Sequence, residues 1–100
     1  MKIIYSDEAI RSLQEVVSFL EENWTQIEMD LFESEFEKFL LNVKDAILTY
    51  QKVDGFKNLQ FALIGNKQVK IYFYRDEYSL EILLFLPSKA DPSRLSNLLK

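Results

Sequence analysis

The chain has 100 residues, a formal net charge of -4, and neither cysteine nor histidine. Without cysteine there are no disulfides or thiolates, and without histidine the commonest general base and metal ligand near neutral pH is missing. The hydrophobic fraction of 48%, with 2 Gly and 2 Pro, predicts one compact domain spanning residues 1–100. No apolar run approaches the ~20 residues of a membrane span, and the first residues turn acidic too soon for a signal peptide. We therefore expect a cytoplasmic protein without a metal or another cofactor.

The charge is unevenly distributed along the chain. Residues 1–66 hold 6 basic and 12 acidic side chains, which gives -6, and residues 67–100 hold 6 basic and 4 acidic side chains, which gives +2. The acidic residues of the first part are typical of a solvated helix surface, and no pair among them is spaced like a metal site. The last third is the mildly basic part of an acidic protein.

A short strand and two helices are predicted in the first half of the chain. Residues 2–5 alternate weakly as a strand does, and Ser6 then offers an N-cap. The apolar residues of the first helix recur at three- and four-residue spacing up to about Asn23-Trp24. Thr25 and Glu28 have the spacing of a capping box and predict the start of a second helix. Its apolar positions are Phe32, Phe36, Phe39, Leu40, Val43 and Ile47. The short connection requires the two helices to form an antiparallel hairpin.

Three strands follow the helices. They are predicted over residues 59–64, 69–74 and 80–86, where β-branched and aromatic residues are frequent. Gly65-Asn66 is expected to be a two-residue type II′ turn. The turn at residues 75–78 carries three charges, and a local ion pair with the following carboxylates is the role we expect for Arg75.

Side-chain alternation assigns the last two strands two different faces. Val69, Ile71 and Phe73 point to one face, and Leu80, Ile82, Leu84 and Leu86 are expected to join them in the core. The opposite face is expected to hold Lys70, Tyr72, Tyr74, Glu81, Leu83 and Phe85. That mixed face is the place where we expect a function.

The chain is expected to end in a short helix. Asp91 is a possible N-cap, and Pro92 suits the first helical turn. The complete order is β-α-α-β-β-β with a short C-terminal helix. This is an α+β fold in which a helical hairpin packs on one face of an antiparallel sheet and the first strand lies alongside.

The ordered set of segments SDEAIRSLQEVVSFLEENW, IYFYR, LEILLFL and KADPSRLSNLL resembles the RelE/ParE superfamily of bacterial toxins. The resemblance covers nearly the whole chain, and Phe73-Tyr74-Arg75 and Asp91-Pro92 are its most telling pieces. It implies the toxin half of a type II toxin–antitoxin pair, of the kind also described as plasmid stabilisation proteins.

The superfamily has two activities, and the resemblance leaves both open. ParE-like members bind DNA gyrase, and RelE-like members cut messenger RNA on the ribosome. The family often carries a His and two basic residues just before the Asp-Pro pair, and of these the chain has only Lys89. We therefore expect a ParE-like toxin that acts by binding and is neutralised by a cognate antitoxin, with a second copy of the chain (a homodimer) as a further candidate partner.

The alternatives concern the same residues. For partner binding, the expected residues are Tyr72, Tyr74, Leu83, Phe85, Arg75 and Lys89. For the nuclease alternative, the catalytic candidates are Tyr74, Lys70, Lys89 and Arg94. The tyrosines on a basic surface would stack on RNA bases, each contributing about 1–3 kcal/mol. A third alternative is a degenerate member that is no longer toxic and serves as an interaction domain.

Overall fold

The computed structural model describes residues 1–45, 50–89 and 93. The elements are β1 (Lys2–Tyr5), α1 (Asp7–Asn23), α2 (Gln26–Asp45), β2 (Gln51–Lys52), β3 (Gln60–Ile64), β4 (Val69–Arg75) and β5 (Ser79–Pro87). The expected α+β order is confirmed, and β2 is an addition of two residues. The predicted C-terminal helix after Asp91 lies outside the described residues, apart from Ser93. No helix within these ranges is long and apolar enough to cross a membrane.

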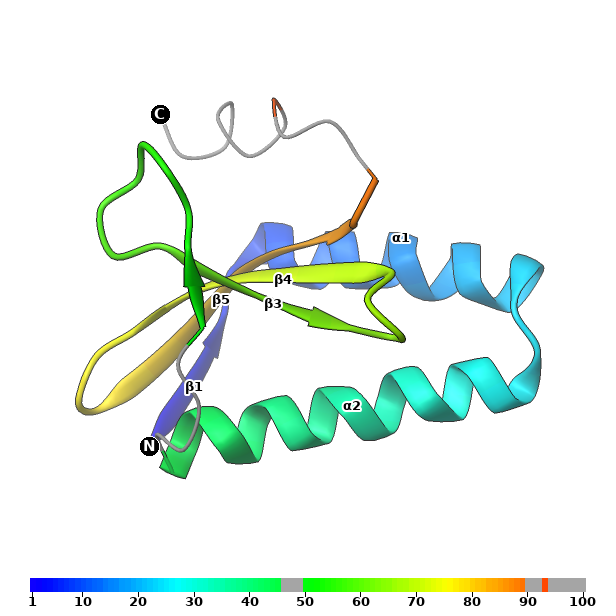
Figure 1. Ribbon diagram of the computed structural model, residues 1–100, viewed down its shortest axis with the longest axis horizontal. Coiled ribbons are helices and arrows are strands. Elements are labelled where there is room, and N and C mark those ends of the chain that lie inside the picture. The colour runs from blue at the N-terminus through cyan, green and yellow to red at the C-terminus, as the bar shows by residue number, and fades with distance from the viewer. Residues whose placement is uncertain (46–49, 90–92, 94–100) are drawn as a thin grey trace.

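The strands form one sheet in the order β1-β5-β4-β3-β2. β1 runs parallel to β5, and the other neighbouring strands are antiparallel. The two helices and the sheet share one core cluster, in which residues of α1 and α2 pack against β3, β4 and β5. Figure 1 shows the helical hairpin and its connection at one end of the molecule. We call the side of the sheet that meets the helices the helix face, and the opposite side the second face.

Both helices begin where their caps predict. The Ser6 hydroxyl accepts a hydrogen bond from the Ala9 N–H at 3.0 Å, as an N-cap does. At the start of α2, the Glu28 N–H donates to the Thr25 hydroxyl at 3.3 Å, and the Thr25 N–H donates to the Glu28 carboxylate at 3.2 Å. This reciprocal pair is the predicted capping box. Local sequence alone therefore sets where the two helices start.

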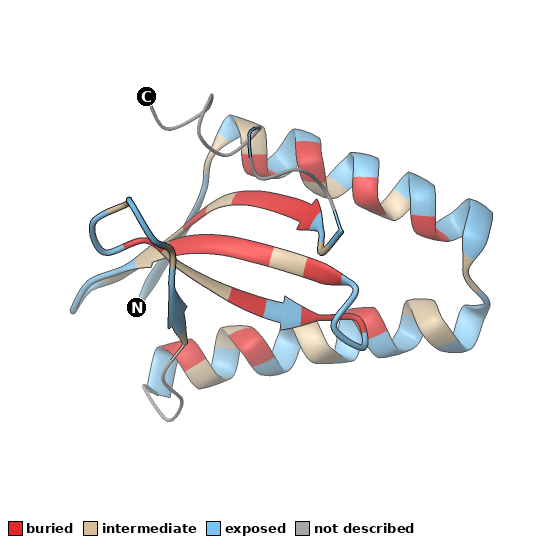
Figure 2. Ribbon diagram, turned by 45° about the horizontal axis from the view of Figure 1, so that its top comes forward, coloured by how far each residue is buried: buried red, intermediate tan, exposed pale blue. Residues whose placement is uncertain are grey.

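The helix face is an aromatic core. Phe73 is fully buried, and its ring centroid lies 5.1 Å from that of Phe39 on α2 and 5.5 Å from that of Tyr50. Both pairs have the edge-to-face geometry that aromatic rings prefer. The buried residues in Figure 2 follow the middle strands and the inner sides of the helices. This packing holds α2 against the sheet.

A register shift between β4 and β5 reverses part of the expected face assignment. Tyr72 pairs with Leu84, but the next residue, Phe73, pairs with Ile82. Leu83 therefore has no partner in this ladder, as in a β-bulge, and the alternation changes phase beyond it. The prediction that Phe85 lies on the second face is wrong, because Phe85 is fully buried in the core under the helices.

The same shift moves two leucines in the other direction. Leu84 and Leu86 were expected in the core under the helices, but they pack in the cluster on the second face. Leu80 and Ile82, which precede the bulge, lie on the helix face as predicted. One unpaired residue is enough for this change, because side chains alternate with a period of two.

Two serines of the α1 region form hydrogen bonds with β5 where β1 has ended. The Ser6 hydroxyl donates to the Leu83 carbonyl at 2.9 Å, and the Phe85 N–H donates to the Ser12 hydroxyl at 3.0 Å. Both groups lie beyond Ile82, the last residue of β5 that pairs with β1. Because an unpaired buried backbone group is costly, these serines stabilise the irregular part of the strand.

The turn between β3 and β4 differs from the prediction in its position and its type. It spans residues 65–68, and the Gln68 N–H donates to the Gly65 carbonyl at 3.2 Å. Gly65, Asn66 and Lys67 have φ angles of 63°, 57° and 67°. The two central residues, Asn66 and Lys67, both have positive φ, which is typical of a type I′ turn. The expected type II′ turn centred on Gly65-Asn66 is therefore wrong. The Asn66 N–H donates to the Glu35 carboxylate at 3.0 Å, which ties the turn to α2.

Candidate functional site

The second face is covered, and Tyr72 is buried beneath the cover. Tyr72 is 5% exposed and packs in a cluster with three other buried residues, Leu59, Leu84 and Leu86. Val53 and Phe56 from the segment between β2 and β3 pack against this cluster. Burial raises the pKa of the Tyr72 phenol above its ordinary value of 10.0, so this phenol is neutral near pH 7. Its surroundings favour a packing role.

Lys70, Tyr74 and Leu83 lie on the same face as Tyr72 and are partly buried. The Lys70 ammonium nitrogen is 4.9 Å from the centroid of the Phe61 ring, which is the geometry of a cation–π contact. Phe61 is also Tyr72's partner across the β3–β4 ladder. The predicted basic and aromatic group therefore exists, but most of its contacts are internal.

Arg75 does not form the expected ion pair with Asp76 or Glu77, because the ion pair found among the described residues is that of Arg11 with Glu8. The Arg75 Nε donates to the Val43 carbonyl at 2.8 Å and so joins β4 to the last turn of α2. The backbone N–H groups of Tyr78 and Ser79 are the main cause of a lowered pKa at Asp76, and the charge of Arg75 adds to this effect. Arg94 lies outside the described residues.

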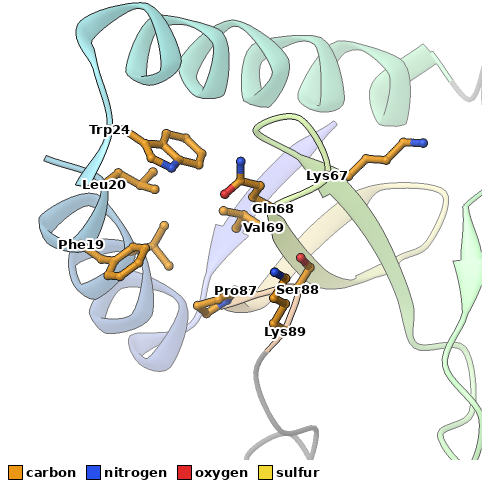
Figure 3. Close-up of a pocket in the computed structure, with 10 residues that line it drawn as sticks. Phe19, Leu20, Trp24, Lys67, Gln68, Val69, Pro87, Ser88 and Lys89 are labelled. Carbon is orange, nitrogen blue, oxygen red and sulfur yellow. The ribbon is translucent and has the colours of Figure 1, made fainter. Parts of the chain in front are cut away.

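Lys89 lines a pocket of about 590 Å³ at the carboxyl end of β5. Figure 3 shows Phe19, Leu20 and Trp24 along the α1 side of this pocket, which also includes Val16. The sheet side is formed by the turn before β4, the first residue of β4 and the end of β5. These residues are Lys67, Gln68, Val69, Pro87, Ser88 and Lys89. We call this the α1 pocket.

The α1 pocket is an apolar hollow with polar groups on one side. Phe19 is 53% exposed, although it is a large apolar side chain. The Trp24 ring packs edge-on against Phe32 with 6.4 Å between centroids, and this contact fixes the pocket wall to α2. Exposed aromatic surface beside lysines suits an apolar segment that carries a carboxylate or another acceptor.

Sequence reasoning missed most of this pocket. The sequence pattern places Trp24 only in the connection between the helices, and it does not distinguish Phe19 from the other residues of the first helix. One signal was present: Phe19 does not belong to the apolar set that recurs along α1. Gln68 and Ser88 meet because of strand pairing, and the Ser88 N–H donates to the Gln68 carbonyl at 2.8 Å.

Two of the catalytic candidates, Tyr74 and Lys89, lie at different ends of the β4–β5 pair. Tyr74 pairs with Glu81 near one end of β5, whereas Lys89 lies beyond Pro87 at the other end, where Val69 is the ladder partner. Tyr74 and Val69 are five positions apart, which corresponds to roughly 17 Å along a strand. The backbones of Tyr74 and Lys89 are therefore well separated along the sheet. Among the described residues, no cluster of acidic side chains has the arrangement of a metal site.

Comparison with known proteins adds no assignment. No family model matches the chain, and no curated protein matches it significantly.

Proposed function

We propose that this protein is the toxin component of a type II toxin–antitoxin module and that it acts, as ParE-like toxins do, by binding a gyrase-type target. In this proposal a cognate antitoxin neutralises it, and the protein works in the cytoplasm. The family resemblance of the sequence is the starting point. The observed β-α-α-β-β-β order, with a helical hairpin on one face of the sheet, agrees with the fold that the resemblance implies.

The observation that favours binding over catalysis is the separation of the catalytic candidates. Tyr74 and Lys89 lie near opposite ends of β5, and Lys70 is engaged with the Phe61 ring. General acid–base catalysis requires groups within hydrogen-bond reach of one reacting centre, about 2.6–3.2 Å. The separation of Tyr74 from Lys89 therefore counts against the RelE-like nuclease alternative.

The α1 pocket is the proposed site for an apolar segment of the antitoxin. Its exposed Phe19 and its volume of about 590 Å³ suit one or two large side chains. An antitoxin tail that folds on binding would bury apolar area here and lose conformational entropy at the same time. Exposed carboxylates of the helices, such as Glu22 and Glu33, favour basic residues on the flanks of that tail.

Expression of the chain alone in bacteria tests the proposed activity. We expect growth arrest with a DNA damage response, and inhibition of supercoiling by purified gyrase when the purified protein is added. Tyr74→Phe and Lys89→Ala are expected to leave toxicity intact if no phosphodiester is cut. Translation arrest with messenger RNA cleavage, abolished by these substitutions, would favour the nuclease. No growth defect would favour the degenerate alternative.

A pair of exposed substitutions tests the pocket. Phe19→Glu places a carboxylate in the α1 pocket, and Ile27→Glu makes the same change at a position on α2 that is 81% exposed. We expect Phe19→Glu to weaken binding of the product of the neighbouring gene at least tenfold, and Ile27→Glu to leave it unchanged. Equal binding by both variants would remove the pocket from the proposal. Circular dichroism of both variants serves as the control that each is folded.

A further inference from the structure

β1 is an edge strand of the sheet as far as the described residues show. Among the described strands its neighbour is β5 alone. The N–H groups of Lys2 and Ser6 donate to the carbonyls of Tyr78 and Ile82 at 2.9 and 3.0 Å. Because the direction of these bonds alternates along a parallel strand, the N–H and C=O groups of Ile3 and Tyr5 point away from β5.

The side chains of β1 are unusual for an edge that stays in water. Ile3, Ile4 and Tyr5 are 41%, 37% and 36% exposed. Edge strands are normally protected from pairing by charges, proline or a bulge, and of these devices β1 has only Lys2. Free backbone donors and acceptors beside three exposed apolar side chains are the features that another strand recognises.

We propose that β1 pairs antiparallel with β1 of a second copy of this chain, which makes one continuous sheet across a two-fold axis at Ile4. The free groups determine the possible registers, because an outward-pointing residue must face another one. With the axis at Ile4, Ile3 faces Tyr5 of the second copy and the two Ile4 side chains meet. With the axis at Ile3, Lys2 would face Ile4, and this register is less favourable.

Charge complementarity favours a second copy over an unrelated strand. In the Ile4 register, Lys2 faces Ser6 of the second copy and lies beside Asp7, which is exposed at the start of α1. The two-fold axis produces this contact twice, and it produces the Ile3–Tyr5 contact twice as well. Because each strand has only four residues, the interface is small and the dimer is expected to dissociate readily.

A single introduced cysteine tests both the contact and its register, because the chain contains none. In the Ile4 register the two Ile4 Cα atoms form a non-hydrogen-bonded pair about 4.5 Å apart, within the range of a disulfide. We expect Ile4→Cys to form a covalent dimer under mild oxidation at least tenfold faster than Lys2→Cys. The two Lys2 positions are four residues out of register, roughly 13 Å along the strands.

Ile27→Cys controls for random collision, since this residue is 81% exposed on α2. Equal rates of cross-linking for the three variants would overturn the proposal. If Lys2→Cys cross-links faster than Ile4→Cys, the register with the axis at Ile4 is wrong, and the proposed pairing of β1 with β1 is overturned.

The mass of the unmodified protein provides a second, independent measurement. Sedimentation equilibrium is expected to show a monomer–dimer mixture that shifts toward dimer as concentration rises. Ile4→Lys places two ammonium groups against each other at the axis, so we expect a monomer with an unchanged unfolding midpoint. A wild-type protein that stays monomeric at every concentration overturns the proposal, and so does a dimer that persists in Ile4→Lys. Neither outcome depends on toxicity, so the proposed function is tested separately.

Discussion

The two faces of the sheet are built from similar residues but are covered in different ways. On the helix face, the rings of Phe73, Phe39 and Tyr50 interlock with centroids 5.1–5.6 Å apart. On the second face, Tyr72 and Leu84 are covered in part by residues of the irregular segment between β2 and β3. Regular helices position a core through many residues at once, whereas a loop contributes a few side chains. We therefore expect the helix face to contribute more to stability and the second face to tolerate substitution better.

Phe73→Ala is expected to have the largest effect. Phe73 is fully buried among aromatic rings, and truncation of a buried Phe costs about 3–5 kcal/mol in unfolding free energy. Tyr74→Ala, on the next position and the opposite face, is the matched control and is expected to lose less than half as much because Tyr74 is only partly buried. Urea denaturation followed by circular dichroism measures both. Equal losses would contradict the difference between the faces.

Ser12→Ala tests the buried polar contact on the helix face. The Ser12 hydroxyl accepts from the Phe85 N–H and donates to the Ala9 carbonyl at 3.2 Å. Its removal leaves the buried Phe85 N–H without this acceptor, which we expect to lower the unfolding free energy by about 1–3 kcal/mol. Ser18→Ala, at an exposed position of the same helix, is expected to change it by less than about 0.5 kcal/mol. If Ser12→Ala leaves the unfolding free energy unchanged, another group accepts the hydrogen bond from the Phe85 N–H.

Gly65→Ala and Gly55→Ala compare a tight turn with an open one. Both glycines have positive φ, 63° and 84°, so an alanine at either is strained by about 1 kcal/mol or more. A Cβ at Gly65 would lie 3.0 Å from the Trp24 ring and 3.2 Å from the Phe32 ring, whereas a Cβ at Gly55 meets nothing within 4 Å. We expect Gly65→Ala to cost roughly 1 kcal/mol more than Gly55→Ala in thermal unfolding. A larger loss of stability for Gly55→Ala than for Gly65→Ala would show that the Trp24 ring moves easily to make room for the new Cβ.

Alkaline pH is expected to give the smallest effect, and it acts on both faces. Burial raises the pKa of Tyr72 on the second face, and burial also raises that of Tyr50 on the helix face, where a hydrogen bond with Asn42 opposes the shift. A raised tyrosine pKa means that the folded state holds its proton longer, so the stability contribution is complete below pH 10 and is lost as the pH rises through the folded pKa.

Tyr72→Phe removes the ionisable group from the second face and should flatten the fall of the unfolding midpoint above pH 10. Tyr50→Phe removes the ionisable group from the helix face in the same way and should also flatten the fall. Denaturant midpoints between pH 8 and pH 11 compare the variants. An unchanged slope in Tyr72→Phe would show that its phenol titrates as it does in the unfolded chain.

Prediction from sequence succeeded where the signal is local. The cap at Ser6, the capping box at Thr25 and Glu28, and the β-branched and aromatic content of β4 each lie within a few residues of what they determine. It was less successful for the candidate site. The sequence singles out Lys89 by its charge and its place before Asp91-Pro92, but Trp24 and Phe19, the aromatic residues that line the same pocket, lie far from it along the chain.

The sequence by itself therefore determined the number, order and limits of the principal helices and strands, because hydrophobic periodicity and capping are properties of short segments. The tertiary structure alone decided which way β5 faces beyond Leu83. That bulge is accompanied by hydrogen bonds from Ser6 to Leu83 and from Phe85 to Ser12, which join residues more than seventy positions apart. The same long-range packing assembled the α1 pocket and, among the described strands, gave β1 a single neighbour, β5. Alternation within a strand cannot reveal an unpaired residue, because the register is set by the partner strand and by the helix that covers it.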